Sequence, residues 1–197
     1  MLNNVKAILT LVIITVIAGA ALGYVYELTK VPIENQERIT REKAYKELFP
    51  EATAFEEASV DIEDLNNRMN SSNYPNDTID GILDAVGNDG SVMGKVITVT
   101  SHAGYGGDIT IVMGVDSAGT LKDISILSIS ETAGLGMNAD TDDFKSQFRN
   151  KNVAQFSYTK TGAVQEYEID AISGATITTS AVTDAINAGL SCFAETN

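Results

Sequence analysis

The segment Asp170-Ala171-Ile172-Ser173-Gly174-Ala175-Thr176-Ile177-Thr178-Thr179-Ser180 is predicted to join a strand to a helix. The residues before it, 165–170, have the two-residue period of a strand. After it, one face of a predicted helix carries an apolar row at i, i+4 spacing: Ala181, Val182, Ala185, Ile186, Gly189, Leu190 and Phe193. Gly174 permits a tight bend and Ala175 is small, so something can approach the backbone of this strand-to-helix turn.

Stretches with a two-residue period dominate the middle of the chain, and they predict strands. These are expected at 82–86, 95–100, 109–115 and 124–129. Asn88-Asp89-Gly90 predicts a hairpin turn, and the alternation in 109–115 predicts a strand buried on one face only. A short helix is expected at 141–149, and the Asn-, Ser- and Asp-rich stretch 66–80 is expected to be a surface loop. Strands grouped between helices, without strict βαβ alternation, predict an α+β domain with antiparallel strands and flanking helices.

The amino-terminal region contains an uncharged stretch of twenty residues, Ala7–Tyr26. As a helix it would span about 30 Å, the thickness of a bilayer's hydrocarbon core. The alternative is a cleaved secretory signal, with Lys6 as its charged region and Ala18-Gly19-Ala20 as its cleavage site. Basic residues on the two sides of the span do not decide its orientation. The membrane interpretation divides the chain into a tail at 1–6, a single transmembrane helix at 7–26, a stalk or linker helix at 27–50 and a soluble domain at 51–197.

The composition limits the function classes that this chain can serve. All 27 acidic residues and 12 of the 13 basic residues follow Tyr26, which gives that part a net charge of −15. Such an acidic body repels phosphate backbones, so no nucleic-acid partner is expected. With one cysteine and one histidine, Cys192 and His102, the chain cannot form an internal disulfide, an iron–sulfur cluster or a zinc site built from those residues. Any redox chemistry must therefore use an organic cofactor.

Hydroxyl residues gather where the last helix is expected to begin. A helix amino terminus offers unpaired N–H groups and the positive end of its dipole, which makes it a seat for phosphate. A hydroxyl beside those amides is also well placed to accept a phosphoryl group, because the amides stabilise the resulting negative charge. The alternative is ordinary: serine and threonine cap helices, and glycine makes turns.

The pattern Asp170-x-x-Ser173-Gly174-Ala175-Thr176 resembles the recognition motif read by bacterial flavin transferases, which join FMN through its phosphate to the last threonine of the motif. The motif is specific because the acid, the Ser-Gly-Ala turn and the threonine all fall in register. It is similar to the FMN-binding domain shared by the G subunit of the Rnf complex and the C subunit of the sodium-pumping quinone reductase. The short chain length favours the Rnf protein.

Two further segments carry the same resemblance. Gly104-Tyr105-Gly106-Gly107 looks like the family's glycine-tyrosine segment, and Glu131-Thr132-Ala133-Gly134-Leu135-Gly136 resembles its second flavin-side loop. Ala133 and Asp108 stand where the family often has proline, which removes local rigidity. The resemblance implies these cofactor-binding residues: Thr176 as the covalent attachment point, with Asp170, Ser173, Gly174, Ala175, Thr178, Thr179, Glu131, Thr132, Gly134, Leu135, Gly136 and Tyr105.

The resemblance implies a membrane-anchored electron-transfer subunit with one covalently bound FMN, in an ion-translocating ferredoxin:NAD oxidoreductase. Its implied partners are the other membrane subunits of the Rnf complex, the lipid bilayer and a flavin transferase for maturation. It also implies a single-pass protein of the cell membrane with an extracytoplasmic soluble domain. No complete active site is visible on this chain alone. Two other functions remain open: a tethered small-anion binding or sensor domain without redox chemistry, and an extracellular flavin reductase outside any pump.

Gly134-Leu135-Gly136-Met137-Asn138-Ala139 also fits the G-x-G-x-x-A pattern of dinucleotide-binding folds. Such a site would need an acid about 20 residues further on, and 156–160 contains none. The pattern therefore favours a turn or a flavin-side loop. His102 is expected to be a hydrogen-bonded surface residue and Cys192 a packed thiol.

Overall fold

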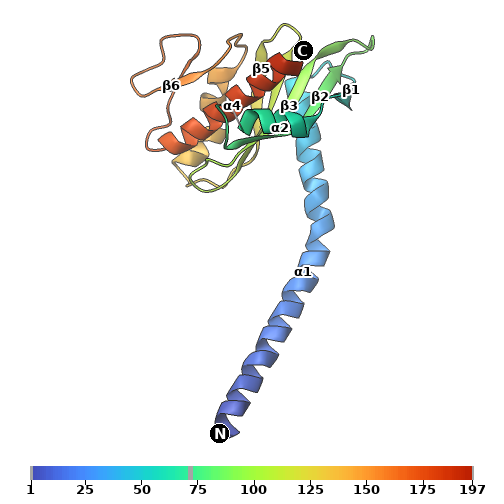
Figure 1. Cartoon of the computed structure of the whole chain (residues 1–197), viewed down its shortest axis with the longest axis vertical. Helices are drawn as coiled ribbons and strands as arrows, with labels where there is room; N and C mark the ends of the chain where they lie inside the picture. The colour runs from blue at the N-terminus through green and yellow to red at the C-terminus, as the bar shows by residue number, and fades with distance from the viewer. Residues whose placement is uncertain (1, 71–72, 197) are drawn as a thin grey trace. The chain divides into compact units, whose positions relative to one another are not determined.

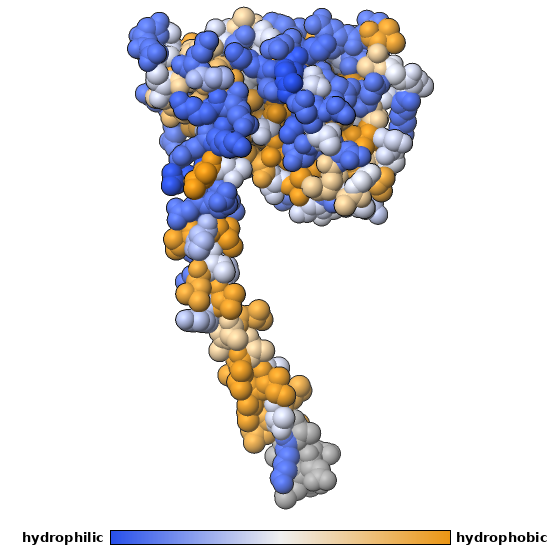
Figure 2. Space-filling model, turned by 180° about the vertical axis from the view of Figure 1, so that it is seen from behind, coloured by the Kyte–Doolittle hydropathy of each residue, from blue (hydrophilic) through white to orange (hydrophobic). Residues whose placement is uncertain are grey.

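The computed structural model describes residues 2–70 and 73–196. The chain forms two compact units, Met1–Glu42 and Lys43–Asn197. The first unit consists of most of the helix α1 (Leu2–Leu48). All its side chains described from Ile8 to Tyr26 are exposed, and Figure 2 shows the apolar surface along this helix. Within the described part of the chain, α1 is the one helix long and apolar enough to cross a membrane, judged by its length and composition.

The helix α1 runs without a break through the predicted transmembrane helix and most of the predicted stalk helix, and Pro32 lies inside it. A proline removes a single backbone donor from a helix. One turn earlier, the Thr29 hydroxyl donates to the Val25 carbonyl oxygen at 2.9 Å. Further on, Arg38 and Glu42 form an exposed i, i+4 ion pair at 2.7 Å. A pair of this kind stabilises a solvated helix by a few tenths of a kcal/mol, roughly.

The second unit is an α+β domain, as the sequence predicted. Its elements in chain order are β1 (Ala54–Glu57), α2 (Ile62–Asn70), β2 (Asp77–Val86), β3 (Val92–Ser101), β4 (Ile109–Asp116), β5 (Leu121–Ser128), the 3-10 turn η1 (Gly136–Asp140), α3 (Asp142–Lys145), the 3-10 turn η2 (Ser146–Phe148), β6 (Ser157–Thr159), β7 (Glu168–Asp170) and α4 (Thr176–Thr196).

Strands β1 to β5 form one antiparallel sheet in their chain order. The predicted hairpin at 88–90 joins β2 to β3, with Gly90 in the left-handed region at φ 79°. Strands β6 and β7 are an exception to the antiparallel prediction, because they pair in parallel as a separate small sheet. The predicted helix at 141–149 is broken into the short pieces α3 and η2.

The helices α4 and α2 lie across the same face of the sheet (Figure 1). Between them and the strands is the larger core, which includes Ile186, Met113 and Leu65. The other face carries a smaller core formed with the end of α1, including Leu48 and Phe49. Both helix layers thus bury the central strands.

The prediction that 109–115 is buried on one face only was wrong. Val112, on the second face of β4, is fully buried. A Cβ atom on its neighbour Gly114 would lie 3.1 Å from the Leu48 Cβ atom, because the end of α1 packs directly against this face. The sequence pattern missed this because valine and glycine at these positions are compatible with either burial or exposure.

The predicted loop at 66–80 was also partly wrong: its first residues belong to α2 and its last residues to β2. Asn66 explains the error. Its side chain accepts a hydrogen bond from Ile79 N at 2.8 Å and donates one to Ile79 O at 3.0 Å, so a residue typical of loops pairs instead with a strand. Residues 71 and 72 lie outside the described part of the chain.

A buried carboxyl group makes the stability of this domain depend on pH. Asp77, at the start of β2, is 3% exposed, and no hydrogen bond to its Oδ1 atom is found among the described residues. Burial, reinforced by the Asp184 carboxylate, raises the pKa of Asp77 to about 6, although a Ser101 hydrogen bond opposes this. Since the folded-state pKa is raised, the stabilisation is complete where Asp77 is protonated, below its unfolded pKa of about 4, and is lost as pH rises through about 6.

We therefore expect Asp77→Asn to be more stable than the wild type at about pH 7.5, by up to about 2 kcal/mol of unfolding free energy. Its melting temperature at that pH should be correspondingly higher. The difference should shrink at about pH 4.5, where the wild-type carboxyl is mostly neutral. Thermal melts followed by circular dichroism at the two pH values measure this. Asp143→Asn, which removes an exposed charge, is the matched control. Equal gains at both pH values, or none, would contradict the role assigned to Asp77.

Candidate functional site

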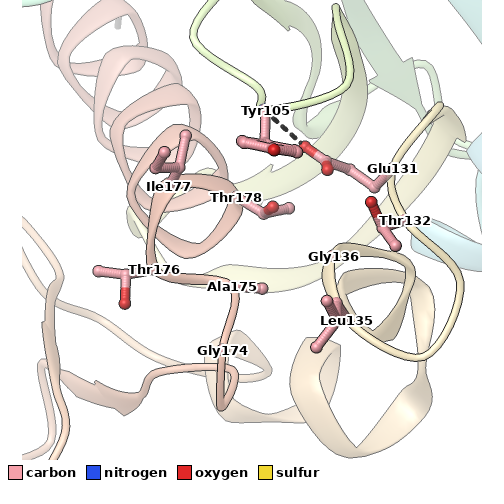
Figure 3. A pocket seen from close by; sticks show the side chains of 10 residues that line it. All are labelled: Tyr105, Glu131, Thr132, Leu135, Gly136, Gly174, Ala175, Thr176, Ile177 and Thr178. Atoms are coloured by element: carbon pink, nitrogen blue, oxygen red, sulfur yellow. Dashed lines mark hydrogen bonds between the residues drawn. The ribbon is translucent and has the colours of Figure 1, made fainter.

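A pocket of about 580 Å³ opens at the amino terminus of α4. This volume lies within the range of small-molecule sites, roughly 300–1,000 Å³. Three segments far apart in the sequence form its walls (Figure 3). Its lining residues are Tyr105, Glu131, Thr132, Leu135, Gly136, Gly174, Ala175, Thr176, Ile177 and Thr178.

The first wall is the turn between β7 and α4. Gly174 adopts φ 76°, a conformation that an L-residue with a side chain rarely takes. The hydroxyl of Thr179 fixes the turn, since it accepts from Ile172 N at 3.1 Å and donates to Ala175 O at 2.9 Å. Both bonds are buried, so this threonine is fully engaged in shaping the backbone.

The helix α4 begins without a capping side chain. Thr179 N donates to Ala175 O, so Ala175 occupies the N-cap position, where its methyl group cannot accept a hydrogen bond. The amides of Thr176, Ile177 and Thr178 are thus the ones that lack an intrahelical acceptor. They lie at the positive end of a 21-residue helix, beside the Thr176 hydroxyl. This donor set fits a phosphate group.

The second wall is the loop before η1. The carbonyl oxygen of Thr132 accepts hydrogen bonds from Leu135 N at 3.1 Å and from Met137 N at 3.2 Å. Within this loop Gly134 adopts φ 76°. Gly136 is buried where this loop meets α4. A Cβ atom there would lie 2.7 Å from Thr178 Oγ1. Because Gly136 has no side chain, the backbone of this loop can pack directly against α4.

The third wall is the glycine-rich segment before β4, which presents Tyr105. This residue is 71% exposed, and its ring faces the pocket (Figure 3). The backbone N–H of Tyr105 donates to Glu131 Oε1 at 2.8 Å, which joins the second and third walls. Two other apolar side chains, Leu135 and Ile177, are also exposed at the pocket, at 43% and 53%. The pocket thus combines amide donors at one end with apolar surface at the other.

The structure brings together most of the residues that the sequence analysis singled out. These line the pocket: Thr176, Gly174, Ala175, Thr178, Glu131, Thr132, Leu135, Gly136 and Tyr105. Figure 3 shows Thr176 at the edge opposite Glu131. Asp170, Ser173, Thr179 and Gly134 are not among the lining residues. Ile177 was missed, because an apolar residue in the first turn of a helix is expected to face the core.

Asp170 holds a neighbouring loop. Its Oδ1 atom accepts from Ala163 N at 2.6 Å, while its backbone N–H donates to Gln147 Oε1 at 2.6 Å. Glu168 fixes the same loop by accepting from Val164 N at 2.9 Å. The acid of the Asp170–Thr176 motif therefore orders the chain just before the turn.

The other candidates behave as structural residues. The ring of the exposed His102 contacts Thr78 Oγ1 at 3.2 Å and Asp108 Oδ1 at 3.0 Å. Cys192 is buried on α4, and burial raises the pKa of its thiol to about 12, so it is a packed thiol. The glycine pattern at 134–139 leads into the 3-10 turn η1 and not into a helix of a βαβ unit.

Residues 104–191, which include every residue that lines the pocket, match the FMN-binding domain family. The α+β domain is therefore of the FMN-binding class. The G subunit of the ion-translocating oxidoreductase complex of Methanosarcina acetivorans is 31% identical over 189 residues, which cover 94% of this chain and 92% of that protein. The G subunit of the Na(+)-translocating ferredoxin:NAD(+) oxidoreductase complex of Acetobacterium woodii is 28% identical over 188 residues, covering 94% and 89%. The chain therefore belongs to the G-subunit family of these ion-translocating (Rnf) complexes.

Among solved structures, the crystal structure of Shewanella oneidensis NqrC matches 54% of this chain and 52% of that chain, with a TM-score of 0.46 and 19% sequence identity.

Proposed function

We propose that this chain is a membrane-anchored electron-transfer subunit of an ion-translocating ferredoxin:NAD oxidoreductase complex, and that it carries one FMN esterified through its phosphate to Thr176. The observation that carries the proposal is the start of α4. There the uncapped amides of 176–178 lie beside the Thr176 hydroxyl, at the edge of a pocket of about 580 Å³. The family match and the G-subunit relatives support the cofactor and the complex.

Each part of the pocket has a role in this proposal. The amides at the start of α4 bind the phosphate, and the Gly174–Ala175 turn leaves room for it. The apolar side chains of Tyr105, Leu135 and Ile177 cover the ring system and exclude water from it. A bound FMN supplies the redox chemistry, while the protein supplies orientation and electrostatics. Thr179 and Gly134 act indirectly, by shaping the backbone of the two loops.

Attachment requires a flavin transferase and an activated FMN whose phosphate is part of a phosphoanhydride. The Thr176 oxygen forms a new P–O bond as the phosphoanhydride P–O bond breaks. The nucleotide portion departs, and the hydroxyl proton passes to a base of the transferase. No electron changes hands in this step. Asp170 contributes by ordering the loop before the strand-to-helix turn, where its Oδ1 atom accepts from Ala163 N.

The anchor keeps the flavin close to the other redox centres of the complex. In this proposal residues 1–6 form a tail, 7–26 cross the bilayer, 27–50 form the stalk and 51–197 form the flavin domain on the extracytoplasmic side. A tether to Thr176 would prevent loss of the cofactor to the extracellular space. Twenty uncharged residues in a helix match a bilayer's hydrocarbon thickness of about 30 Å.

Intact mass and a peptide map of the full chain, co-expressed with a flavin transferase, test the proposal. The expected mass is that of the chain plus one FMN less one water, with the adduct on the peptide that contains Thr176. An unmodified, colourless chain that binds inorganic phosphate would instead support the small-anion sensor. An adduct on a different residue would overturn the assignment of the attachment site.

A further inference from the structure

Glu131 lies where the three walls of the pocket meet. Its Oε1 atom accepts the backbone N–H of Tyr105 at 2.8 Å, across 26 residues of sequence (Figure 3). Its Oε2 atom lies 2.6 Å from the position that a Cβ atom on Gly136 would occupy, and Thr178 Oγ1 lies 2.7 Å from that same position. One carboxylate thus contacts the tyrosine segment and fills the space beside η1 and α4.

The tyrosine segment is held tightly against Glu131. A Cβ atom on Gly106 would lie 2.1 Å from Ser130 O, and one on Gly104 would lie 2.1 Å from Gly107 O. Backbone atoms at these distances leave no space for a side chain, so the glycines permit close packing of the loop. Tyr105 is therefore presented from a fixed loop, and the Glu131 hydrogen bond is its link to the opposite wall.

The charge of Glu131 is not neutralised by an ion pair. In the ranges 2–70 and 73–196, no salt bridge includes this residue. Its carboxylate lines the pocket and is partly buried. A negative charge beside a partly desolvated site disfavours any further negative charge there. Reduction adds electrons to a flavin, so this carboxylate opposes it.

We propose that Glu131 is a positioning residue with two separable effects, an inference that rests on the proposed FMN site. Its hydrogen-bonding oxygen fixes Tyr105 as a wall that shields the flavin. Its charge lowers the reduction potential of the flavin. These effects follow from the contacts that the carboxylate makes within the protein: Oε1 accepts from Tyr105 N, and Oε2 occupies the space beside Gly136.

Two substitutions separate these effects in the full chain loaded with FMN. Glu131→Gln keeps an acceptor oxygen for Tyr105 N and removes the charge. We expect its midpoint potential to shift to a more positive value, while quenching of flavin fluorescence by iodide stays at the wild-type level. Glu131→Ala removes both the acceptor and the charge. We expect the same positive shift together with stronger quenching. FMN added to the Thr176→Ala form should bind about tenfold more weakly, because the protein loses the hydrogen bond that fixes the Tyr105 wall.

Glu57→Gln, which removes an exposed charge from the edge strand β1, is the control and should change neither measurement. A wild-type potential in Glu131→Gln would overturn the electrostatic effect. Wild-type quenching and affinity in Glu131→Ala would overturn the positioning effect. Both outcomes require a flavin-loaded wild type, so they are distinct from failure of the proposed function, in which the wild type itself carries no FMN.

Discussion

The Thr176→Ala variant should fold normally and carry no covalent flavin. The substitution removes the acceptor oxygen and leaves the rest of the turn intact, because Thr179 and Gly174 fix the backbone. The Thr176 hydroxyl makes no hydrogen bond within the described residues, and the side chain is only partly buried. We therefore expect a change in unfolding free energy within about 0.5 kcal/mol. Intact mass should give the unmodified chain, with no flavin absorbance after denaturation and gel filtration.

Thr176→Ser is the matched control, because it keeps the oxygen and removes one methyl group. It should still be modified, and its adduct should map to the same peptide. The pocket itself remains in the alanine variant, so added FMN should bind reversibly and be lost on denaturation. A covalent flavin in Thr176→Ala would mean that the acceptor is another residue.

The strand-to-helix turn could be predicted because its signals are local. A two-residue period, a glycine and an apolar helical row follow one another between residues 165 and 193. The helix nevertheless begins at Thr176, well before the apolar row that predicted it. Thr179 lies in the turn before that row: it is buried, and its hydroxyl group donates a hydrogen bond to the backbone carbonyl oxygen of Ala175. In the sequence alone, a buried threonine of this kind resembles a turn residue.

The pocket could be anticipated only through the family resemblance. Tyr105, Glu131 and Thr176 are widely separated in the sequence, and no local pattern indicates that their segments meet. What brings them together is the packing of glycine backbones, such as Gly106 against Ser130, which depends on the whole fold. The same resemblance groups Asp170 with the flavin-site residues, and the structure adds a contact that no local pattern indicates, from Ala163 N to the Asp170 Oδ1 atom.

The second buried face of the sheet was missed for a similar reason. A strand that is buried on both faces shows a continuous run of large apolar residues only when the side chains on both faces are large. Here one face carries small residues, which leave space for a bulky side chain from another element. Gly94 on β3 and Gly114 on β4 are those small residues, and Phe49 packs against both. Their importance is visible only once the end of α1 is known to pack there.

Gly94→Ala should therefore destabilise the domain by on the order of 3 kcal/mol or more, since overpacking against backbone cannot relax cheaply. The new Cβ atom would lie 2.3 Å from Val115 O and 2.7 Å from Asp116 Cα, both on the paired strand β4, and 2.8 Å from Phe49 Cζ. Two of these three atoms are backbone, so the strands must separate or the variant must unfold. For a domain of this size, the melting temperature should fall by about 6–12 °C.

Gly81→Ala provides the matched comparison, because it makes the same chemical change in the same sheet. Gly81 lies on β2, and a Cβ atom there would meet nothing within 4 Å. Its unfolding free energy should stay within about 1 kcal/mol of the wild-type value, so its melting temperature should change little. Alanine restricts the unfolded chain more than glycine does, which favours the folded state slightly. Thermal melts of both variants in detergent, as full chains, test the argument. If Gly94→Ala had the same melting temperature as Gly81→Ala, the close approach of Gly94 to Val115 and Phe49 would not limit the side chain at position 94, and the packing argument for this face of the sheet would be wrong.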